Sequence, residues 1–176
     1  MKIVLFQPQI PQNTGNIVRT CSVTGNSLVL IRPLGFSTSS RMLKRAGLDY
    51  WEGVDVGYLE DLFSYLTALT TPFYFFSSHA EKFYTEPDYT TQDHLIFGSE
   101  TEGLPPQYRE KWPEKFFKIP MKPESRCLNL SNAASIVIYE AWRKQQFIPH
   151  SVKNFDTTPS TIVKPRGFGA VQIPSF

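Results

Sequence analysis

Short apolar runs that alternate with helical patterns constrain the fold of this chain most. The runs are almost continuous in Val, Ile, Leu and Phe, and each is expected to form a buried strand. They cover residues 2–6, 27–31, 73–76, 94–97 and 116–119. Strands of this kind, separated by helices, predict an α/β fold with a parallel sheet covered by helices on both faces. Ligands of such sheets bind where the strands end, so the loops after these runs are the informative ones.

The helices expected between the strands rest on an apolar period of three to four residues and on capping residues. They cover residues 13–25, 41–46, 59–69, 106–112 and 131–146. The last of them is the longest, and from Ala133 to Trp142 only Ser135 and Glu140 are polar. A helix that is apolar nearly all round is expected to be buried in the core or in an oligomer interface.

Length and composition indicate one folded domain followed by a tail. The chain has 176 residues, 41% hydrophobic and 19% charged, which excludes a mostly disordered protein. No apolar run approaches the roughly 18 residues that a membrane span needs, and no signal peptide is visible. From about Ile148 onward Ser, Thr, Pro and Gly dominate. We therefore expect a domain over residues 1–147, an extended or disordered tail over 148–176, and no membrane association.

The two cysteines and three histidines do not form a metal site or a disulfide framework by their spacing. Cys21 and Cys127 lack a CxxC pattern, and the histidines lack the spacing of metal ligands. The simplest setting is a reducing cytoplasm, with no bound metal. Cys127 has no histidine motif that would make it a nucleophile, so a loop or core thiol is the favoured interpretation.

Positive charge is concentrated at the start of the chain. Residues 1–48 contain six Lys or Arg and no Asp or Glu, whereas residues 49–117 contain thirteen acids and four bases. The residues after 117 are again basic overall. Basic segments from both ends of a chain can fold into one patch that attracts phosphate. A solvated helix surface explains the charge equally well, so the charge alone does not give the function and only leaves nucleic acid open as a partner.

The first polar segment that could carry chemistry follows the first strand, over residues 8–20. On a helix, Asn16 lies on one face with Arg19 and Thr20, and Asn13 precedes it by one turn. A guanidinium among amides at the end of a strand suits a phosphate or a ribose hydroxyl. The alternative is a capped surface helix with an isolated arginine.

Two further polar segments follow later strands. Residues 97–105 read FGSETEGLP, where Gly98 and Gly103 allow a close approach to the backbone. Glu100 and Glu102 suit acid–base work or hydrogen bonds to amides, and no phosphate-binding glycine motif is present. The third segment reads IPM and then SRCLNLSNAAS, over residues 119–121 and 125–135. Amides and hydroxyls before a buried helix need partners, either backbone or ligand.

Taken together, the three segments resemble the SPOUT class of RNA methyltransferases, in the order typical of that class. The opening KIVLFQPQIPQNTGNIVRTC makes the chain most similar to the tRNA (cytidine/uridine-2'-O)-methyltransferase family. The resemblance covers about residues 2–147. It implies S-adenosylmethionine-dependent 2'-O-methylation of the wobble nucleotide of certain leucine tRNAs, a homodimer, and a deep trefoil knot near the C-terminus of the domain. The knot is an exception to the general rule for chain connections.

Two alternatives remain open beside this interpretation. One is 2'-O-methylation of ribosomal RNA, and the other is an RNA-binding or adenosyl-binding module without catalysis. The intact Arg19, Glu100 and Asn129 favour an enzyme over a binding module.

The resemblance also implies roles for individual residues. Glu100, Asn129, Ser131 and Arg19 match active-site positions, and Asn13, Asn16 and Arg19 are expected to contact the substrate. A guanidinium keeps its proton up to a pH of about 12, so Arg19 either is shifted by its surroundings or only orients the phosphate and the hydroxyl. Many relatives carry Ser where this chain has Cys127. The expected cofactor contacts are Phe76, Gly98, Ile119, Met121, Cys127 and Leu128.

Overall fold

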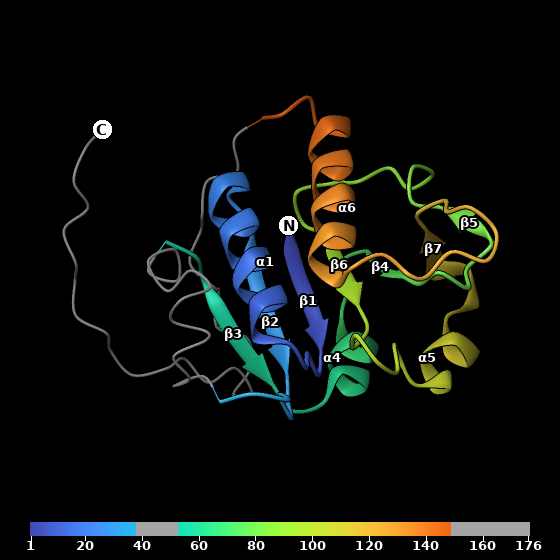
Figure 1. The fold of residues 1–176 in the computed structure, drawn as a ribbon. Coiled ribbons are helices and arrows are strands. Elements are labelled where there is room, and N and C mark those ends of the chain that lie inside the picture. Colours follow the sequence, from blue (N-terminus) through green and yellow to red (C-terminus); the bar gives the residue numbers. More distant parts are fainter. Residues whose placement is uncertain (38–52, 149–176) are drawn as a thin grey trace.

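The computed structural model describes residues 1–37 and 53–148 and contains a seven-stranded parallel sheet (Figure 1). The strands lie in the order β3-β2-β1-β6-β4-β7-β5, and all the paired strands run parallel. The expected parallel α/β sheet is confirmed. The strands are β1 (Lys2–Phe6), β2 (Ser27–Ile31), β3 (Val56–Leu59), β4 (Phe73–Phe76), β5 (Lys82–Phe83), β6 (His94–Phe97) and β7 (Phe116–Lys118).

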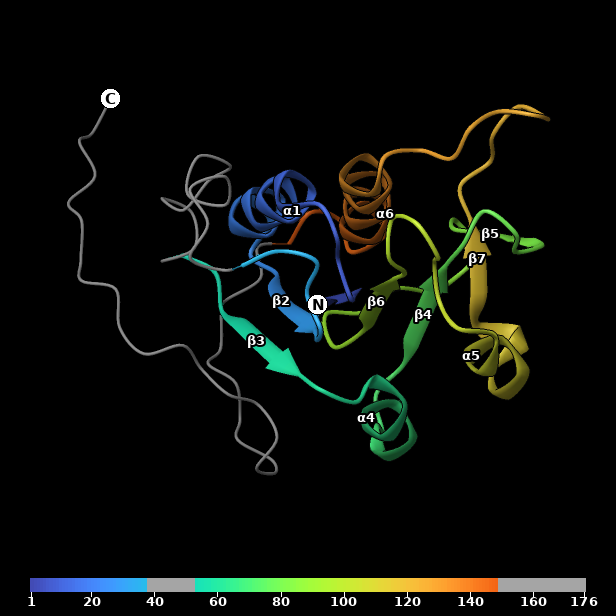
Figure 2. The same cartoon turned by 60° about the horizontal axis from the view of Figure 1, so that its bottom comes forward.

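Helices cover both faces of the sheet, which explains why the strands are apolar on both sides. Helices α1 and α6 lie on one face, and α4 and α5 lie on the other (Figure 2). Side chains such as Ile17 and Val137 pack on the first face, whereas Leu62 and Tyr108 pack on the second. The helices are α1 (Pro11–Thr24), α4 (Leu62–Ala68), α5 (Pro106–Lys111) and α6 (Leu130–Lys144), with a 3₁₀ turn at Pro113–Lys115.

The helix predicted over residues 59–69 is shorter than expected and begins later. Val56–Leu59 forms strand β3, and α4 begins at Leu62. The Asp61 carboxylate caps that helix, because its Oδ1 accepts hydrogen bonds from the N–H groups of Phe63 at 2.9 Å and Ser64 at 3.2 Å. The two-residue strand β5 was not predicted either, since it is exposed and too short to show a pattern.

Helix α1 begins earlier than the capping residues indicated. It starts at Pro11, and its N-cap residue Ile10 makes no side-chain cap. Asn13 and Thr14 are buried inside the helix, so the amide of Asn13 serves another purpose. The short basic helix expected over residues 41–46 lies outside the described residues, and so does the tail from residue 149 onward.

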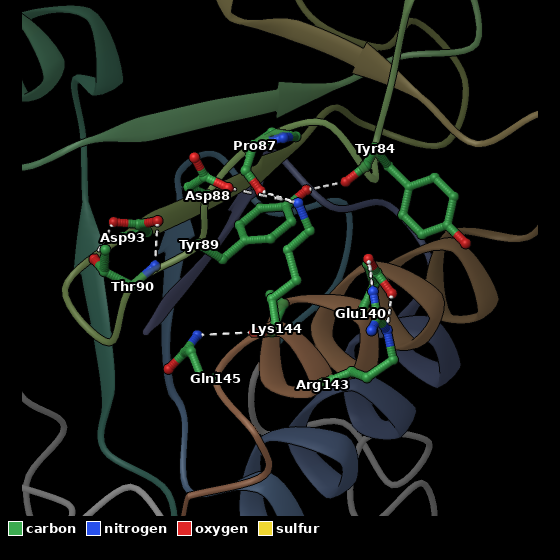
Figure 3. A network of polar contacts seen from close by, with 11 residues as sticks. Tyr84, Pro87, Asp88, Tyr89, Thr90, Asp93, Glu140, Arg143, Lys144 and Gln145 are labelled. Atoms are coloured by element: carbon green, nitrogen blue, oxygen red, sulfur yellow. Dashed lines mark hydrogen bonds and ion pairs between the residues drawn. The ribbon is translucent and has the colours of Figure 1, made fainter.

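The C-terminal end of α6 is bound to the segment that leads from β5 to β6 (Figure 3). Lys144 Nζ donates a hydrogen bond to the Pro87 carbonyl oxygen at 2.8 Å and lies 3.8 Å from the Asp88 carboxylate. The same ammonium lies 6.0 Å from the ring centre of Tyr89, whose hydroxyl donates to the Tyr84 carbonyl oxygen. These contacts hold the connection between β5 and β6 against the end of α6 (Figure 3).

Within the described ranges, no helix combines the length and the apolar character that a membrane crossing requires. The same ranges contain no group of three or more His, Cys, Asp or Glu side chains that could hold a metal ion.

Candidate active site

The loops that follow β4, β6 and β7 meet at the carboxyl edge of the sheet, where parallel sheets bind ligands. They line a cavity of about 740 Å³. Small-molecule sites occupy roughly 300–1,000 Å³, so the cavity is large enough for a nucleoside-sized cofactor. All the residues expected to contact the cofactor line this cavity: Phe76, Gly98, Ile119, Met121, Cys127 and Leu128.

One part of the wall is apolar and another is polar. Phe76 and Phe97 stack with their ring centres 5.1 Å apart, and Leu128 leaves 40% of its surface exposed beside them. The Cys127 thiol lies 3.4 Å from the Ser78 hydroxyl and so connects the loop after β7 with the loop after β4. Four polar lining residues lie outside the three polar segments recognised in the sequence: Ser77, Ser78, His79 and Arg109.

The loop after β6 depends on its two glycines. Ser99 and Gly103 exchange two backbone hydrogen bonds, each 3.0 Å long, which closes a tight turn. A Cβ atom at Gly98 would lie 2.4 Å from the carbonyl carbon of Gly103, so no larger residue fits there without moving the turn. Gly103 has a φ of +69°, a conformation that glycine adopts readily. The two glycines thus shape the cavity wall.

Glu100 lies in this turn, and both of its carboxylate oxygens accept hydrogen bonds. Oε2 accepts from the backbone N–H of Gln9 at 2.8 Å. Oε1 accepts from the backbone N–H of Ile10 at 3.2 Å and from the side-chain amide of Asn13 at 2.9 Å. The carboxylate therefore joins the turn after β6 to the residues that lead into α1 and to the first turn of that helix.

The same polar chain continues from α1 to the start of α6. The Asn129 side-chain amide donates to Asn13 Oδ1 at 2.9 Å. Asn129 Oδ1 in turn accepts from the backbone N–H of Ser131 at 2.9 Å and from its hydroxyl at 2.7 Å, which makes Asn129 the N-cap of α6. Glu100, Asn13 and Asn129 line the cavity, whereas Ser131 does not line it and contacts it only through its hydrogen bonds to Asn129.

Arg19 and Asn16 lie apart from this group. Both are exposed on the outer side of α1, and neither lines the cavity. Near them, the Thr20 hydroxyl lies 3.1 Å from the Ser135 hydroxyl of α6, so the two helices are in contact there. Six residues were expected at the active site or in substrate binding. A chain of hydrogen bonds joins four of them: Asn13, Glu100, Asn129 and Ser131. The other two, Asn16 and Arg19, lie on a separate face.

The model of the SpoU rRNA Methylase family matches residues 1–139, which is most of the described chain. The chain belongs to the SpoU methylase family. The match includes the loops after β4, β6 and β7 and most of α6, so it spans the whole cavity.

The matches to two relatives of this chain span nearly the full length of each relative. A Geobacillus stearothermophilus protein, provisionally named a tRNA (cytidine(34)-2'-O)-methyltransferase, is 46% identical over 151 residues, which are 84% of this chain and 96% of that protein. A solved structure from work on the 2-OH methylation of C/U34 on tRNA is 42% identical, with a TM-score of 0.76, and the match covers 84% of this chain and 97% of that one.

A more distant SpoU methyltransferase shares the fold. It is AviRb from Streptomyces viridochromogenes, solved in complex with the cofactor AdoMet. The two chains are 20% identical with a TM-score of 0.72, and the match covers 83% of this chain and 58% of AviRb. This likeness establishes a shared architecture.

Proposed function

We propose that this SpoU methylase transfers a methyl group from S-adenosylmethionine to the 2'-oxygen of the wobble ribose, cytidine or uridine, of tRNA. The observation that carries the proposal is the cavity at the carboxyl edge of the sheet, with Glu100, Asn13 and Asn129 joined by hydrogen bonds on its wall. The names of the two near-full-length relatives support the choice of tRNA and of position 34. Leucine tRNA as the substrate rests on the family resemblance, and the proposed setting is the cytoplasm, where tRNA is available.

The cavity fits S-adenosylmethionine in size and in chemistry. An adenine ring needs apolar walls, which Phe97, Ile119 and Leu128 provide. Its ring nitrogens and the ribose hydroxyls need hydrogen-bond partners, and the irregular loops around Gly98 and Met121 present backbone groups at the cavity. When bound, the cofactor supplies a methyl group on a sulfonium, which is a good leaving group.

In this proposal Glu100, Asn129 and Ser131 act by positioning. Glu100 accepts three hydrogen bonds from the protein, so its oxygens are engaged in holding the start of α1. Asn129 does the same for the start of α6. Holding the two helices and the loop in one geometry keeps the cofactor and the ribose in line, which is the main requirement of a direct methyl transfer.

Arg19 orients the RNA in this proposal. A guanidinium is a poor base, because its pKa is above about 12, whereas it binds phosphate and hydroxyl oxygens well. Its exposed place on α1 suits contact with a large substrate. Asn16, exposed three residues earlier in the same helix, is a second contact for the RNA.

We include a homodimer formed through α1 and α6. The outer faces of these helices carry apolar side chains with large exposed fractions: Val23 at 58%, Ile136 at 37% and Tyr139 at 45%. Arg19 and Asn16 lie on the same outer face of α1, so a dimer of this kind would bring them near the interface. A deep trefoil knot formed by the segments around β6, β4 and β7 is part of the same proposal. Its support is the family resemblance.

Ribosomal RNA is the second candidate substrate, because the matching family model is described as rRNA methylases. The test is to map 2'-O-methylation by mass spectrometry in tRNA and rRNA from a strain that lacks this protein. We expect the wobble ribose of a tRNA to lose its methyl group, and purified protein with S-adenosylmethionine to restore it. Loss from rRNA alone would overturn the choice of tRNA. Cofactor binding without any methyl transfer would indicate a binding module.

A further inference from the structure

Arg109 places a positive charge on the wall of the cofactor cavity. It lies in the last turn of α5, and of the described residues that line the cavity it is the only lysine or arginine. The acids on the same wall are Glu100, whose oxygens accept hydrogen bonds from the start of α1, and Glu102, which lies in the same loop between β6 and α5. The apolar part of the wall suits an adenosine, and the guanidinium on the same wall suits a negatively charged group of a ligand.

The contacts of Arg109 hold its guanidinium in a defined place. Nη2 donates a hydrogen bond to the His79 carbonyl oxygen at 2.6 Å, in the loop after β4. The guanidinium also lies 5.6 Å from the ring centre of Phe116, which lines the same cavity. A guanidinium has five N–H donors in a planar fork, and the bond to His79 uses one of them. The remaining donors can bind a ligand without reordering the side chain.

The charges of the proposed cofactor indicate which part of it Arg109 would meet. S-adenosylmethionine carries two positive groups, the sulfonium and the α-ammonium, and one negative group, the α-carboxylate. A guanidinium beside either positive group is repelled, whereas a carboxylate matches its fork with two parallel hydrogen bonds. Adenine carries no charge and gains most from the apolar part of the wall.

We propose that Arg109 binds the α-carboxylate of S-adenosylmethionine and so directs the amino-acid end of the cofactor toward α5 and the loop after β4. This inference rests on the proposed function, because it assumes that the cavity holds that cofactor. His79 contributes through its carbonyl oxygen, which orients the guanidinium. The adenosyl end then lies toward Ile119 and Leu128, on the apolar part of the wall.

The experiment is a binding cycle by calorimetry with two ligands that differ only in the carboxylate: S-adenosylmethionine and decarboxylated S-adenosylmethionine. The variant is Arg109→Gln in the full chain. We expect its affinity for S-adenosylmethionine to fall about tenfold, which corresponds to about 1.4 kcal/mol. We expect its affinity for the decarboxylated ligand to change less than about twofold, since no partner of Arg109 is left to lose. Arg109→Lys, which keeps the charge but not the fork, should lie between the wild type and Arg109→Gln.

Lys111→Gln is the matched control, because Lys111 is exposed in the same last turn of α5 and does not line the cavity. It should bind both ligands as the wild type does. Equal losses for both ligands in Arg109→Gln would overturn the inference, since Arg109 would then only shape the wall through His79 and Phe116. Unchanged affinity for both ligands, with weaker RNA binding, would also overturn it. A wild-type protein that binds neither ligand would overturn the proposed function itself.

Discussion

Glu100 shows how single residues carry the architecture of this site. Its carboxylate accepts hydrogen bonds from two backbone N–H groups and from Asn13, and it thereby joins the loop after β6 to the start of α1. The sequence indicated either an acid–base group or a partner of amides. The geometry agrees with the second of these roles, because the contacts with α1 occupy both oxygens.

We predict that Glu100→Gln lowers both stability and methyl transfer. A glutamine has one acceptor oxygen, and its NH₂ group would face a backbone donor, so at least one of these donors loses its partner. The free energy of unfolding should fall by about 1–3 kcal/mol in urea titrations. Glu102→Gln is the control, because Glu102 is an exposed acid in the same turn, and it should unfold as the wild type does. Wild-type stability of Glu100→Gln would contradict the role of Glu100 in holding the start of α1.

Arg19 can be separated experimentally from the proposed cofactor site, since it does not line the cavity. Arg19→Ala should abolish methyl transfer to tRNA and leave the affinity for S-adenosylmethionine nearly unchanged. Single-turnover assays and calorimetry measure the two effects. Loss of cofactor binding in a folded Arg19→Ala protein would show that Arg19 has been placed wrongly.

His94 makes stability depend on pH. Burial, with a smaller effect of Lys2, lowers the pKa of His94 to about 3, from an ordinary value of about 6.5. Between these two values the unfolded chain binds a proton that the folded chain does not, so the free energy of unfolding should rise with pH across this window. The slope should approach about 1.4 kcal/mol per pH unit inside it. In His94→Gln the contribution of this group to the slope should disappear. Urea titrations from pH 4 to 7 measure the slope, and the same slope in His94→Gln as in the wild type would contradict this prediction.

At the scale of elements, the contact between α6 and the segment before β6 can be tested through Lys144. Lys144→Met keeps most of the aliphatic stem and removes the hydrogen bond to the Pro87 carbonyl oxygen. We expect faster amide hydrogen exchange in residues 84–93 and a stability loss of about 1 kcal/mol. Arg143→Met is the control, because Arg143 pairs with Glu140 inside the same helix. Equal exchange in both variants would mean that Lys144 does not hold this segment.

The elements also show where sequence patterns were sufficient. The buried strands were recognised because each is almost wholly apolar, as in Lys2–Phe6 and His94–Phe97. The start of α1 was misplaced, since the N–H groups just before it bind Glu100, which lies 90 residues from Ile10 in the sequence. Leu59, the last residue of strand β3, was taken as the start of a helix because it continues the apolar period of α4, and the rest of β3 was not predicted. Local spacing cannot distinguish the two where a turn as short as residues 60–61 separates them.

At the scale of the whole molecule, the exposed apolar face of α6 predicts association. Ile136→Glu combined with Tyr139→Glu places two charges on that face and should convert a dimer into monomers, as sedimentation at micromolar concentration would show. Phe83→Glu is the control, because Phe83 is as exposed as Tyr139 but lies on β5, at the edge of the sheet. A wild-type protein that sediments as a monomer would contradict the proposed dimer.

The sequence by itself determined the parallel sheet and the loops that carry the cavity, and the family resemblance supplied six of the residues that line it. The sheet and the loops depend on neighbours along the chain, because apolar runs define strands and a polar loop after a strand lies at the ligand edge. Only the tertiary structure decided what the side chains do. Glu100, Asn13 and Asn129 come from three separate segments, and Arg109 reaches the cavity from a short helix with no motif of its own. Such contacts form between distant parts of the chain, and local spacing carries no record of them.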